Sequence, residues 1–188
     1  MSSAVEHVET LYQGRSSFRI VTVRRADGVI QRREIEDHGQ AVCVLPYDPD
    51  RRTALLVRQF RVPVFLVNKA EDTLEAIAGI LESQDPFECA RREAMEEAGL
   101  QLTRLESVAS AWTMPGCSTE LMHLYLAPYG EADRIGPGGG LPEEHEATQI
   151  VELTLSGLAA LADTGRLDDM KTLVLVQTLR LRRPELFA

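Results

Sequence analysis

Residues 75–100, EAIAGILESQDPFECARREAMEEAGL, constrain the fold of this chain more than any other stretch. Asp85 is a favourable N-cap, Pro86 suits the first helical position, and Glu88 stands three residues after the cap, as in a capping box. Gly99 suits the left-handed residue that commonly ends a helix. The stretch therefore predicts a short polar loop followed by one well-bounded helix.

One face of this predicted helix is acidic. Glu93, Glu96 and Glu97 stand at i, i+3 and i+4, so their carboxylates project from the same side. Like charges at this spacing repel, but hard oxygen ligands gathered in this way suit Mg²⁺. The alternative is a solvated acidic surface flanked by Arg91 and Arg92. Helical spacing assigns four other residues to the inward face: Phe87, Ala90, Ala94 and Met95.

The order of residues around these carboxylates resembles a known motif. Gly79 followed by Arg92-Glu93, Glu96-Glu97 and Gly99-Leu100 is similar to the Nudix box of nucleoside diphosphate hydrolases, whose helical part reads REUxEExGU with U apolar. The first half departs from the pattern, because one residue fewer separates Gly79 from the helix and Gln84 or Asp85 replaces the middle Glu. The missing residue falls in the loop, so the helical carboxylates keep their spacing.

The shortened box looks like that of the GDP-mannose pyrophosphatase branch, a sister of the ADP-ribose pyrophosphatases. The likeness continues through segments 32–42, 55–62, 114–127, 138–146 and 165–172, so it covers most of the chain in order. It implies an α/β fold, the Nudix α/β/α sandwich with a mixed sheet between helices. It also implies an N-terminal antiparallel β lobe at residues 1–38, which crosses to the second subunit of a homodimer, before a hydrolase domain at residues 39–188.

The resemblance also implies a metal site. Glu93, Glu96 and Glu97, with the backbone carbonyl of Ala78, would hold Mg²⁺, and substitution by Mn²⁺ stays open. Arg92 would pair with a box carboxylate and fix its rotamer. The acidic loop after the glycine-rich segment would supply one more metal ligand or the base, most simply Glu144 with Glu143 beside it, and Glu146 stays open. A disordered acidic loop is the alternative there.

Substrate contacts are implied at several further positions. In the lobe, Arg32, Arg33 and Glu34 would touch the nucleotide of the partner chain, or they belong to a plain exposed strand. Arg58 would bind substrate or form an edge salt bridge. Lys171 would lie near the sugar phosphate or be an ordinary surface lysine in the first turn of a helix. The remaining implied contacts are Gly79, Glu120 and Glu143.

The rest of the chain shows strand and turn signals in order. Residues 1–12 are ambiguous, and residues 63–74 have little periodicity and are expected to be a loop. Asp169 is expected to start a last helix. Alternating or β-branched runs predict strands at 18–23, 29–35, 41–47, 53–60, 121–127 and 149–153, with a hairpin turn at Asp27-Gly28.

Composition limits the partners and the compartment. The formal net charge is −9, which argues against a nucleic-acid surface. Cys43, Cys89 and Cys117 show neither metal-ligand spacing nor a disulfide framework, which fits a reducing cytoplasm. We find no signal peptide and no apolar run of membrane-spanning length, and so expect no membrane partner.

These observations predict an enzyme. We expect Mg²⁺-dependent hydrolysis of the diphosphate bridge in a nucleoside diphosphate sugar. With GDP-mannose the products would be GMP and mannose 1-phosphate; with ADP-ribose, the close alternative, they would be AMP and ribose 5-phosphate. A different class of protein, a module that binds a nucleotide sugar without cleaving it, is the third hypothesis.

Overall fold

The computed structural model describes residues 2–82, 85–140 and 148–188, and the chain divides into two compact units. The first unit runs to Ala41 and includes Ser110–Met122; the second comprises Val42–Ala109 and His123–Ala188. Four residues named above lie outside the described residues: Gln84, Glu143, Glu144 and Glu146.

The first unit is built on a three-stranded antiparallel sheet of order β1-β2-β3. Its strands are β1 (Ala4–Gln13), β2 (Ser17–Arg24) and β3 (Ile30–Asp37). The predicted hairpin is confirmed, with Gly28 at φ 82° in the turn. The ambiguous N-terminal residues form β1, an edge strand whose residues are all exposed. Its pairing with β2 has two register shifts. Its apolar residues, among them two valines and Tyr12, do not alternate regularly with polar ones, so the sequence shows no strand pattern there.

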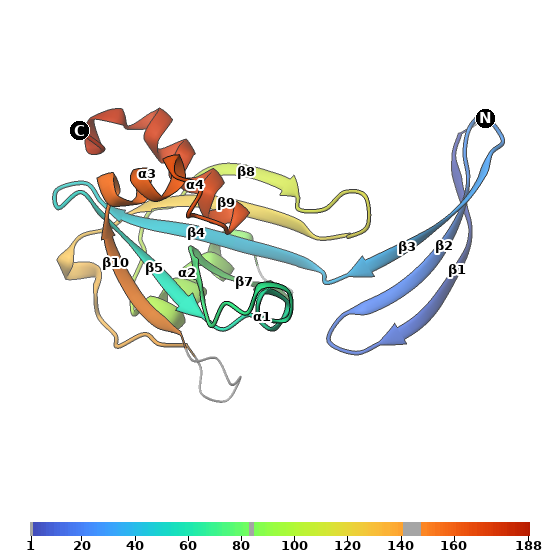
Figure 1. The fold of residues 1–188 in the computed structure, drawn as a ribbon, viewed down its shortest axis with the longest axis horizontal. Coiled ribbons are helices and arrows are strands. Elements are labelled where there is room, and N and C mark those ends of the chain that lie inside the picture. Colours follow the sequence, from blue (N-terminus) through green and yellow to red (C-terminus); the bar gives the residue numbers. More distant parts are fainter. Residues whose placement is uncertain (1, 83–84, 141–147) are drawn as a thin grey trace. The chain divides into compact units, whose positions relative to one another are not determined.

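The second sheet has seven strands and mixed pairing. Its main path is β10-β5-β4-β9-β8, with β6 on β5 and β7 on β4 (Figure 1). The strands are β4 (Gln40–Asp48), β5 (Thr53–Gln59), β6 (Thr73–Glu75), β7 (Ile77–Leu81), β8 (Glu106–Trp112), β9 (Leu121–Pro128) and β10 (Gln149–Thr154).

Helices cover both faces of this sheet. Successive side chains of a strand point to opposite faces. Val42 and Val44 pack in one core with α2 (Pro86–Ala98), which lies behind the strands in Figure 1. Cys43 and Leu45 are fully buried on the other face. That face carries α3 (Leu155–Asp163) and α4 (Met170–Arg182), with buried leucines of their own. The sheet is thus the middle layer of an α/β/α sandwich, and the predicted fold class is confirmed.

Two local predictions are wrong. The expected loop at 63–74 contains α1 (Val62–Asn68) and the start of β6. Helix α1 buries none of its residues, so its sequence has no amphipathic pattern from which a helix could be predicted. Phe87, expected in the core, is 41% exposed; its ring packs at a tilt against Tyr125, with the ring centroids 4.8 Å apart.

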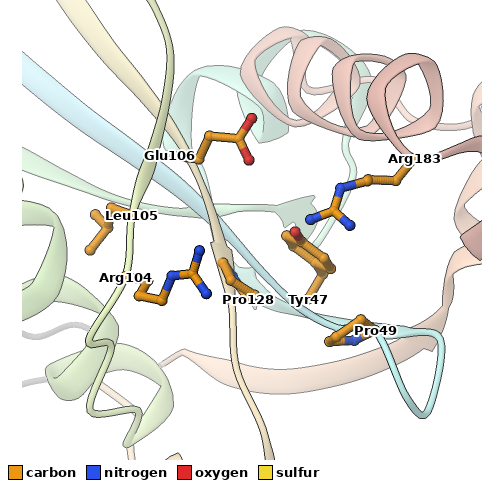
Figure 2. Close-up of a pocket in the computed structure, with 7 residues that line it drawn as sticks. All are labelled: Tyr47, Pro49, Arg104, Leu105, Glu106, Pro128 and Arg183. Atoms are coloured by element: carbon orange, nitrogen blue, oxygen red, sulfur yellow. The ribbon is translucent and has the colours of Figure 1, made fainter.

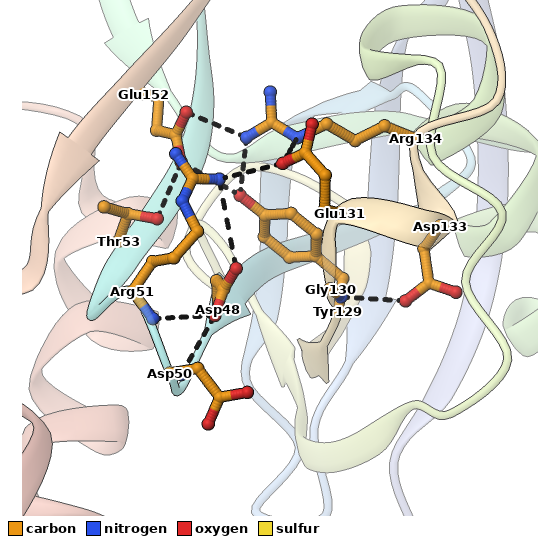
Figure 3. A network of polar contacts seen from close by, with 10 residues as sticks. All are labelled: Asp48, Asp50, Arg51, Thr53, Tyr129, Gly130, Glu131, Asp133, Arg134 and Glu152. Carbon is orange, nitrogen blue, oxygen red and sulfur yellow. Dashed lines mark hydrogen bonds and ion pairs between the residues drawn. The ribbon is translucent and has the colours of Figure 1, made fainter.

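A polar network ties the β4–β5 turn to β10 and to the short helix η1 (Glu131–Asp133), as Figure 3 shows. Glu152 of β10 is its centre: it pairs with Arg51 at 2.7 Å and with Arg134 at 2.8 Å. Thr53 also donates a hydrogen bond to it at 2.7 Å. Burial raises the pKa of Glu152, but these donors outweigh burial and the pKa lies below its usual value. The network fixes the end of the sheet away from β6.

Within the described ranges, no helix is both long and apolar enough to span a bilayer. All three cysteines are free thiols: Cys43 and Cys89 are buried and Cys117 is exposed. The last element is a short helix, η3 (Pro184–Leu186).

Candidate active site

The acidic helix α2 begins and ends where the sequence predicts. The Asp85 carboxylate accepts a hydrogen bond from the N–H of Phe87 at 2.9 Å, so Asp85 caps the helix. Gly99 has φ 66°, and its N–H donates to the Met95 carbonyl at 3.0 Å. Both ends of the helix are therefore fixed by local chemistry, which holds its side chains in a defined orientation.

Two of the three clustered carboxylates are buried. Glu93 is 7% exposed and Glu97 is 2% exposed, while Glu96 is partly buried. The solvated acidic surface is therefore the wrong reading of this face. Carboxylates out of water are unfavourable unless positive charge or hydrogen-bond donors compensate them. This face of α2 is thus a place that attracts cations.

Arg92 supplies part of that compensation. Its guanidinium donates to Glu96 Oε2 at 2.6 Å and to Glu93 Oε1 at 2.6 Å. Burial lowers the pKa of Arg92, but the charges of Glu93 and Glu96 outweigh burial and raise it above its usual value. The expected pairing of Arg92 with the box carboxylates is present, and it holds two of them in fixed rotamers.

Gly79 makes room for the Glu93 carboxylate. A Cβ atom at Gly79 would lie 2.0 Å from both Cδ and Oε1 of Glu93. Such a contact is impossible without displacing the carboxylate or the strand. Gly79 stands in β7, next to Ala78, whose carbonyl is the predicted backbone ligand. The glycine of the motif is therefore required by close approach of strand and helix rather than by its own backbone torsion.

The end of α2 is also held by the segment Gly136–Gly140, called here the glycine strap. The N–H groups of Gly139 and Gly140 donate to the carbonyls of Glu97 and Glu96 at 2.8 and 3.1 Å. Gly138 and Gly139 have φ 61° and 101°, conformations that glycine adopts without strain. The sequence suggested a segment without a fixed conformation, but the strap is anchored to the helix that carries the carboxylates.

A second charged group lies at β6, called here the Glu75 network. Glu75 is 3% exposed and accepts two hydrogen bonds from Arg61, each of 2.8 Å. It also accepts hydrogen bonds from the Thr73 hydroxyl and, at 2.5 Å, from Lys171. Burial raises the pKa of Glu75, but Arg61 and Lys171 outweigh it and lower the pKa to about 2. Glu75 is therefore an anion in the folded protein at neutral pH.

The first turn of α4 completes the Glu75 network. Lys171 has a side chain only 15% exposed and pairs with Asp169 at 2.8 Å as well as with Glu75, so it is not an ordinary surface lysine. Asp169 caps α4 by accepting from the N–H and the hydroxyl of Thr172. The fully buried Thr172 hydroxyl in turn accepts from the N–H of Ala76 at 2.6 Å. Helix α4 is thereby joined to the strand that leads to Ala78.

The Glu75 network and the acidic helix both influence one residue of β4. The pKa of the buried Cys43 thiol is raised, chiefly by burial. The charges of Lys171, Asp169, Glu75 and Glu97 also act on this thiol. The predicted substrate lysine Lys171 and the predicted metal-binding carboxylate Glu97 therefore both contribute to the electrostatic surroundings of Cys43.

The other predicted substrate residues have separate surroundings. Arg58, at the end of β5, pairs with Asp72 at 2.7 Å, as the edge salt bridge would have it. Arg32, Arg33 and Glu34 are exposed on β3 of the first unit, where Arg32 lies 3.7 Å from Glu9. Glu120 also lies in the first unit, where its carbonyl closes a turn by accepting from the N–H of Thr113 at 3.2 Å.

Sequence reasoning missed the Glu75 network as a unit. Arg61 was visible beside Arg58 at the strand end, and Glu75 opens the segment that leads to Gly79, but nothing in the sequence joins them to Asp169 and Thr172. A signal was present in the composition of the strand: Glu75 is a charged residue at the head of an otherwise apolar run. A charge in such a place needs a partner.

The residues present fit a divalent cation by their chemistry. Glu93, Glu96 and Glu97 offer hard oxygen donors, and the missing side chain at Gly79 leaves the Glu93 carboxylate close to the backbone of β7. Across residues 2–82, 85–140 and 148–188, no three His, Cys, Asp or Glu side chains are arranged as a ready cluster. Instead, Arg92 lies between Glu93 and Glu96.

Comparison with known proteins gives consistent results. The sequence pattern of the NUDIX domain family matches residues 37–172. The chain is 38% identical over 161 residues to a GDP-mannose pyrophosphatase of Cronobacter sakazakii, covering 84% of this chain and 83% of that protein. It is 38% identical over 156 residues to a protein of the same name from Pectobacterium atrosepticum, covering 82% and 80%.

A solved structure described as an ADP compounds hydrolase shares the fold. It matches with a TM-score of 0.77 at 18% sequence identity, covering 98% of this chain and 96% of that chain. At this identity the likeness concerns the arrangement of the backbone alone.

Proposed function

This chain belongs to the Nudix family, and from that premise we propose that it hydrolyses the diphosphate bridge of a nucleoside diphosphate sugar, first of all GDP-mannose. It is a hydrolase of phosphorus anhydrides. Membership of that class argues against a module that binds without cleaving. GMP and mannose 1-phosphate would be the products. ADP-ribose, giving AMP and ribose 5-phosphate, is the alternative substrate.

One observation carries the proposal: two buried carboxylates, Glu93 and Glu97, stand beside a glycine whose Cβ would displace Glu93. A structural helix face has no use for buried negative charge at this density, since burying ions is unfavourable. A site for a cation that meets a diphosphate does have such a use. The carboxylates therefore support a metal-assisted reaction.

Nudix hydrolases generally use divalent metals, and the ion proposed here is Mg²⁺, with Mn²⁺ as a substitute. Glu93, Glu97 and the Ala78 carbonyl would hold it, with Glu96 contributing through water. A bound cation supplies charge neutralisation at the diphosphate and an activated water. Arg92 donates hydrogen bonds to both Glu93 and Glu96 and so holds their carboxylates in place.

The loop that follows the glycine strap would complete the site. Glu144, with Glu143 beside it, is proposed to take the proton from the attacking water or to add a ligand. The support for this is the anchor: Gly140, the last described residue before the loop, is bonded to the carbonyl of Glu96 on the acidic helix.

Two cationic side chains would bind the anionic substrate. Lys171 is held by Glu75 and Asp169, so its ammonium group is oriented before substrate arrives. Arg58, at the end of β5, is the second, and its exposed partner Asp72 is easily exchanged for a phosphate oxygen.

The first unit is proposed to pair with a second copy of the chain, so that the protein works as a homodimer. Strand β1 exposes apolar side chains that a partner would cover, among them Val5, Leu11 and Tyr12. Arg32, Arg33, Glu34 and Glu120 would then contribute to substrate binding. Deletion of residues 1–36 should give an inactive monomer in size-exclusion chromatography coupled to light scattering; an active monomer would refute this part. A cytoplasmic location also stays a prediction.

The reaction is tested by product analysis with GDP-mannose, ADP-ribose, GDP-glucose and UDP-sugars, each with Mg²⁺ and with chelator. Metal-dependent release of GMP from GDP-mannose is expected. AMP from ADP-ribose instead would move the substrate assignment and keep the reaction. Binding without any product would favour the non-catalytic module.

The metal assignment is tested by Glu97→Gln, which removes an anionic ligand at nearly constant volume. We expect the melting temperature to be kept and turnover to fall by about a hundredfold or more, the range seen when one strong electrostatic contact is lost from a site. Glu88→Gln, on the exposed side of the same helix, is the matched control. Activity of Glu97→Gln near that of the control would refute the assignment.

A further inference from the structure

A pocket of about 480 Å³ lies in the second unit, at the opposite end of β4 from the acidic helix site. Its volume falls within the range of about 300–1,000 Å³ that small-molecule sites occupy. Figure 2 shows its lining: Arg104 and Arg183 reach in from different elements toward Tyr47 and Pro128. The walls thus combine cationic groups with apolar ones.

Tyr47 is the buried member of this lining. The residue is 1% exposed, and within the described part of the chain its hydroxyl makes no hydrogen bond of normal geometry. Leaving such a group without a partner is unfavourable by about 1–3 kcal/mol, and buried polar groups nearly always have one. Burial raises the pKa of Tyr47, and the charge of Arg183 and its approach to the hydroxyl oxygen oppose that rise. Since an arginine can only donate, the hydroxyl keeps its own proton to offer to a ligand.

The charge of the pocket is positive. Arg183 has only a distant carboxylate partner, Glu185 at 4.0 Å, and no ion pair of Arg104 occurs among the residues whose positions are described. The one acidic residue of the lining, Glu106, is already paired with Arg182 at 2.5 Å. Two guanidinium groups and one hydroxyl therefore face the pocket, against one carboxylate that has its ion-pair partner outside the lining.

The pocket is separate from the candidate active site. Tyr47 and Cys43 both lie in β4 and are four residues apart, which is roughly 13 Å along a strand. Val42 and Val44, on either side of Cys43, pack in one core with α2, the helix that carries the carboxylates of the candidate active site. The lining of the pocket shares no residue with that site.

We propose that this pocket is a second ligand site, which binds the phosphate group of a small phosphomonoester. Arg104 and Arg183 offer donors only, the Tyr47 hydroxyl can add one more donor, and guanidinium forks match phosphate oxygens in pairs. Three terminal oxygens of a phosphate serve this set better than the two of a carboxylate. Pro49, Leu105 and Pro128 form an apolar wall for the body of the ligand. The proposal does not depend on the reaction assigned to the acidic helix.

Calorimetric titration of the full chain with phenyl phosphate, in buffer with chelator and without phosphate, tests the proposal. We expect one site per chain, with affinity that falls as salt is added. Arg104→Gln and Arg183→Gln should each weaken binding about tenfold, the usual effect of losing a charge-assisted hydrogen bond. Glu106→Gln should tighten it, because it removes the negative charge of the lining.

Tyr47→Phe separates binding from structural support. It removes only the hydroxyl, so binding should weaken about fivefold while the melting temperature without ligand stays equal or rises. A structural hydroxyl would instead lower the melting temperature. Arg180→Gln, in helix α4 and outside the pocket, removes the same charge as Arg104→Gln and Arg183→Gln and should bind as the wild type does.

Three results would overturn the proposal. The first is no binding of phenyl phosphate up to about 10 mM, weaker than most specific sites. The second is a change in the wrong place: unchanged affinity in Arg104→Gln, Arg183→Gln and Tyr47→Phe, or loss of affinity in Arg58→Gln. Loss in Arg58→Gln would assign the ligand to the candidate active site. The third is equal affinity for benzoate, which would remove the phosphate preference.

Discussion

Glu75→Gln is the substitution whose effect on stability is best defined by the structure. Glu75 has a side chain 4% exposed and is ionised in the folded state, with its pKa lowered from 4.5 to about 2. A folded-state pKa below the unfolded value stabilises the fold above the unfolded pKa and ceases to do so as the pH falls through the folded one. The contribution is thus present at neutral pH and disappears between about pH 4.5 and pH 2.

The magnitude follows from the shift. One pKa unit corresponds to about 1.36 kcal/mol, so the lowering of the pKa from 4.5 to about 2 contributes about 3 kcal/mol near pH 7. Of this, about 2 kcal/mol should be lost between pH 7 and pH 3 by linkage. The introduced amide cannot ionise, so the Glu75→Gln variant should be less stable at pH 7, and its disadvantage should shrink by about 2 kcal/mol at pH 3.

Urea unfolding of both proteins, followed by circular dichroism at pH 7, 5, 4 and 3, measures this difference. Glu88→Gln is the control, because Glu88 has a side chain 64% exposed and pairs with Arg91 only at 3.3 Å. Its free energy of unfolding should follow that of the wild type at every pH. If the wild type and Glu75→Gln lose stability in parallel down to pH 3, Glu75 is not the low-pKa anion and the reasoning fails.

Two further predictions come from close contacts in the site. Gly79→Ala should abolish most activity with the fold retained, because its Cβ would displace the Glu93 carboxylate. Gly116→Ala is the control and should leave kcat unchanged, since nothing lies within 4 Å of a Cβ at that position. Equal kcat for the two variants would refute the contact. Thr172→Val should lower the free energy of unfolding by about 1–3 kcal/mol, because it leaves the N–H of Ala76 unpaired. Thr172→Ser keeps the hydroxyl and should keep the stability of the wild type. Equal stability of the two variants would contradict the hydrogen bond from Ala76 to Thr172.

Sequence reasoning succeeded where local chemistry decides the structure. The bounds of α2 follow from Asp85, Pro86 and Gly99, each of which acts on its own neighbours. The strands of the central sheet were visible because burial on both faces selects apolar, β-branched residues. The acidic cluster was visible because helical spacing puts i, i+3 and i+4 on one side.

The failures concern features that only the folded chain defines. Strand β1 exists through its pairing with β2, and helix α1 buries no residue, so neither leaves a period in the sequence. Lys171 resembled a surface lysine because its partner Glu75 is 96 residues away along the chain. Burial of Glu93 depends on the approach of β7, which the spacing of the carboxylates does not encode.

The glycine strap has an electrostatic consequence for the helix it holds. The peptide dipoles of α2 sum to a partial negative charge at its C-terminal end, where Glu96 and Glu97 stand and where no basic residue occupies the last turn. The negative charges of these two carboxylates and the negative end of the helix dipole therefore repel each other within α2. The N–H groups of Gly139 and Gly140 point at the terminal carbonyls and bring positive ends of dipoles to this point. The strap thus offsets the negative potential at this end of α2 and keeps the last turn helical whether or not a cation is bound.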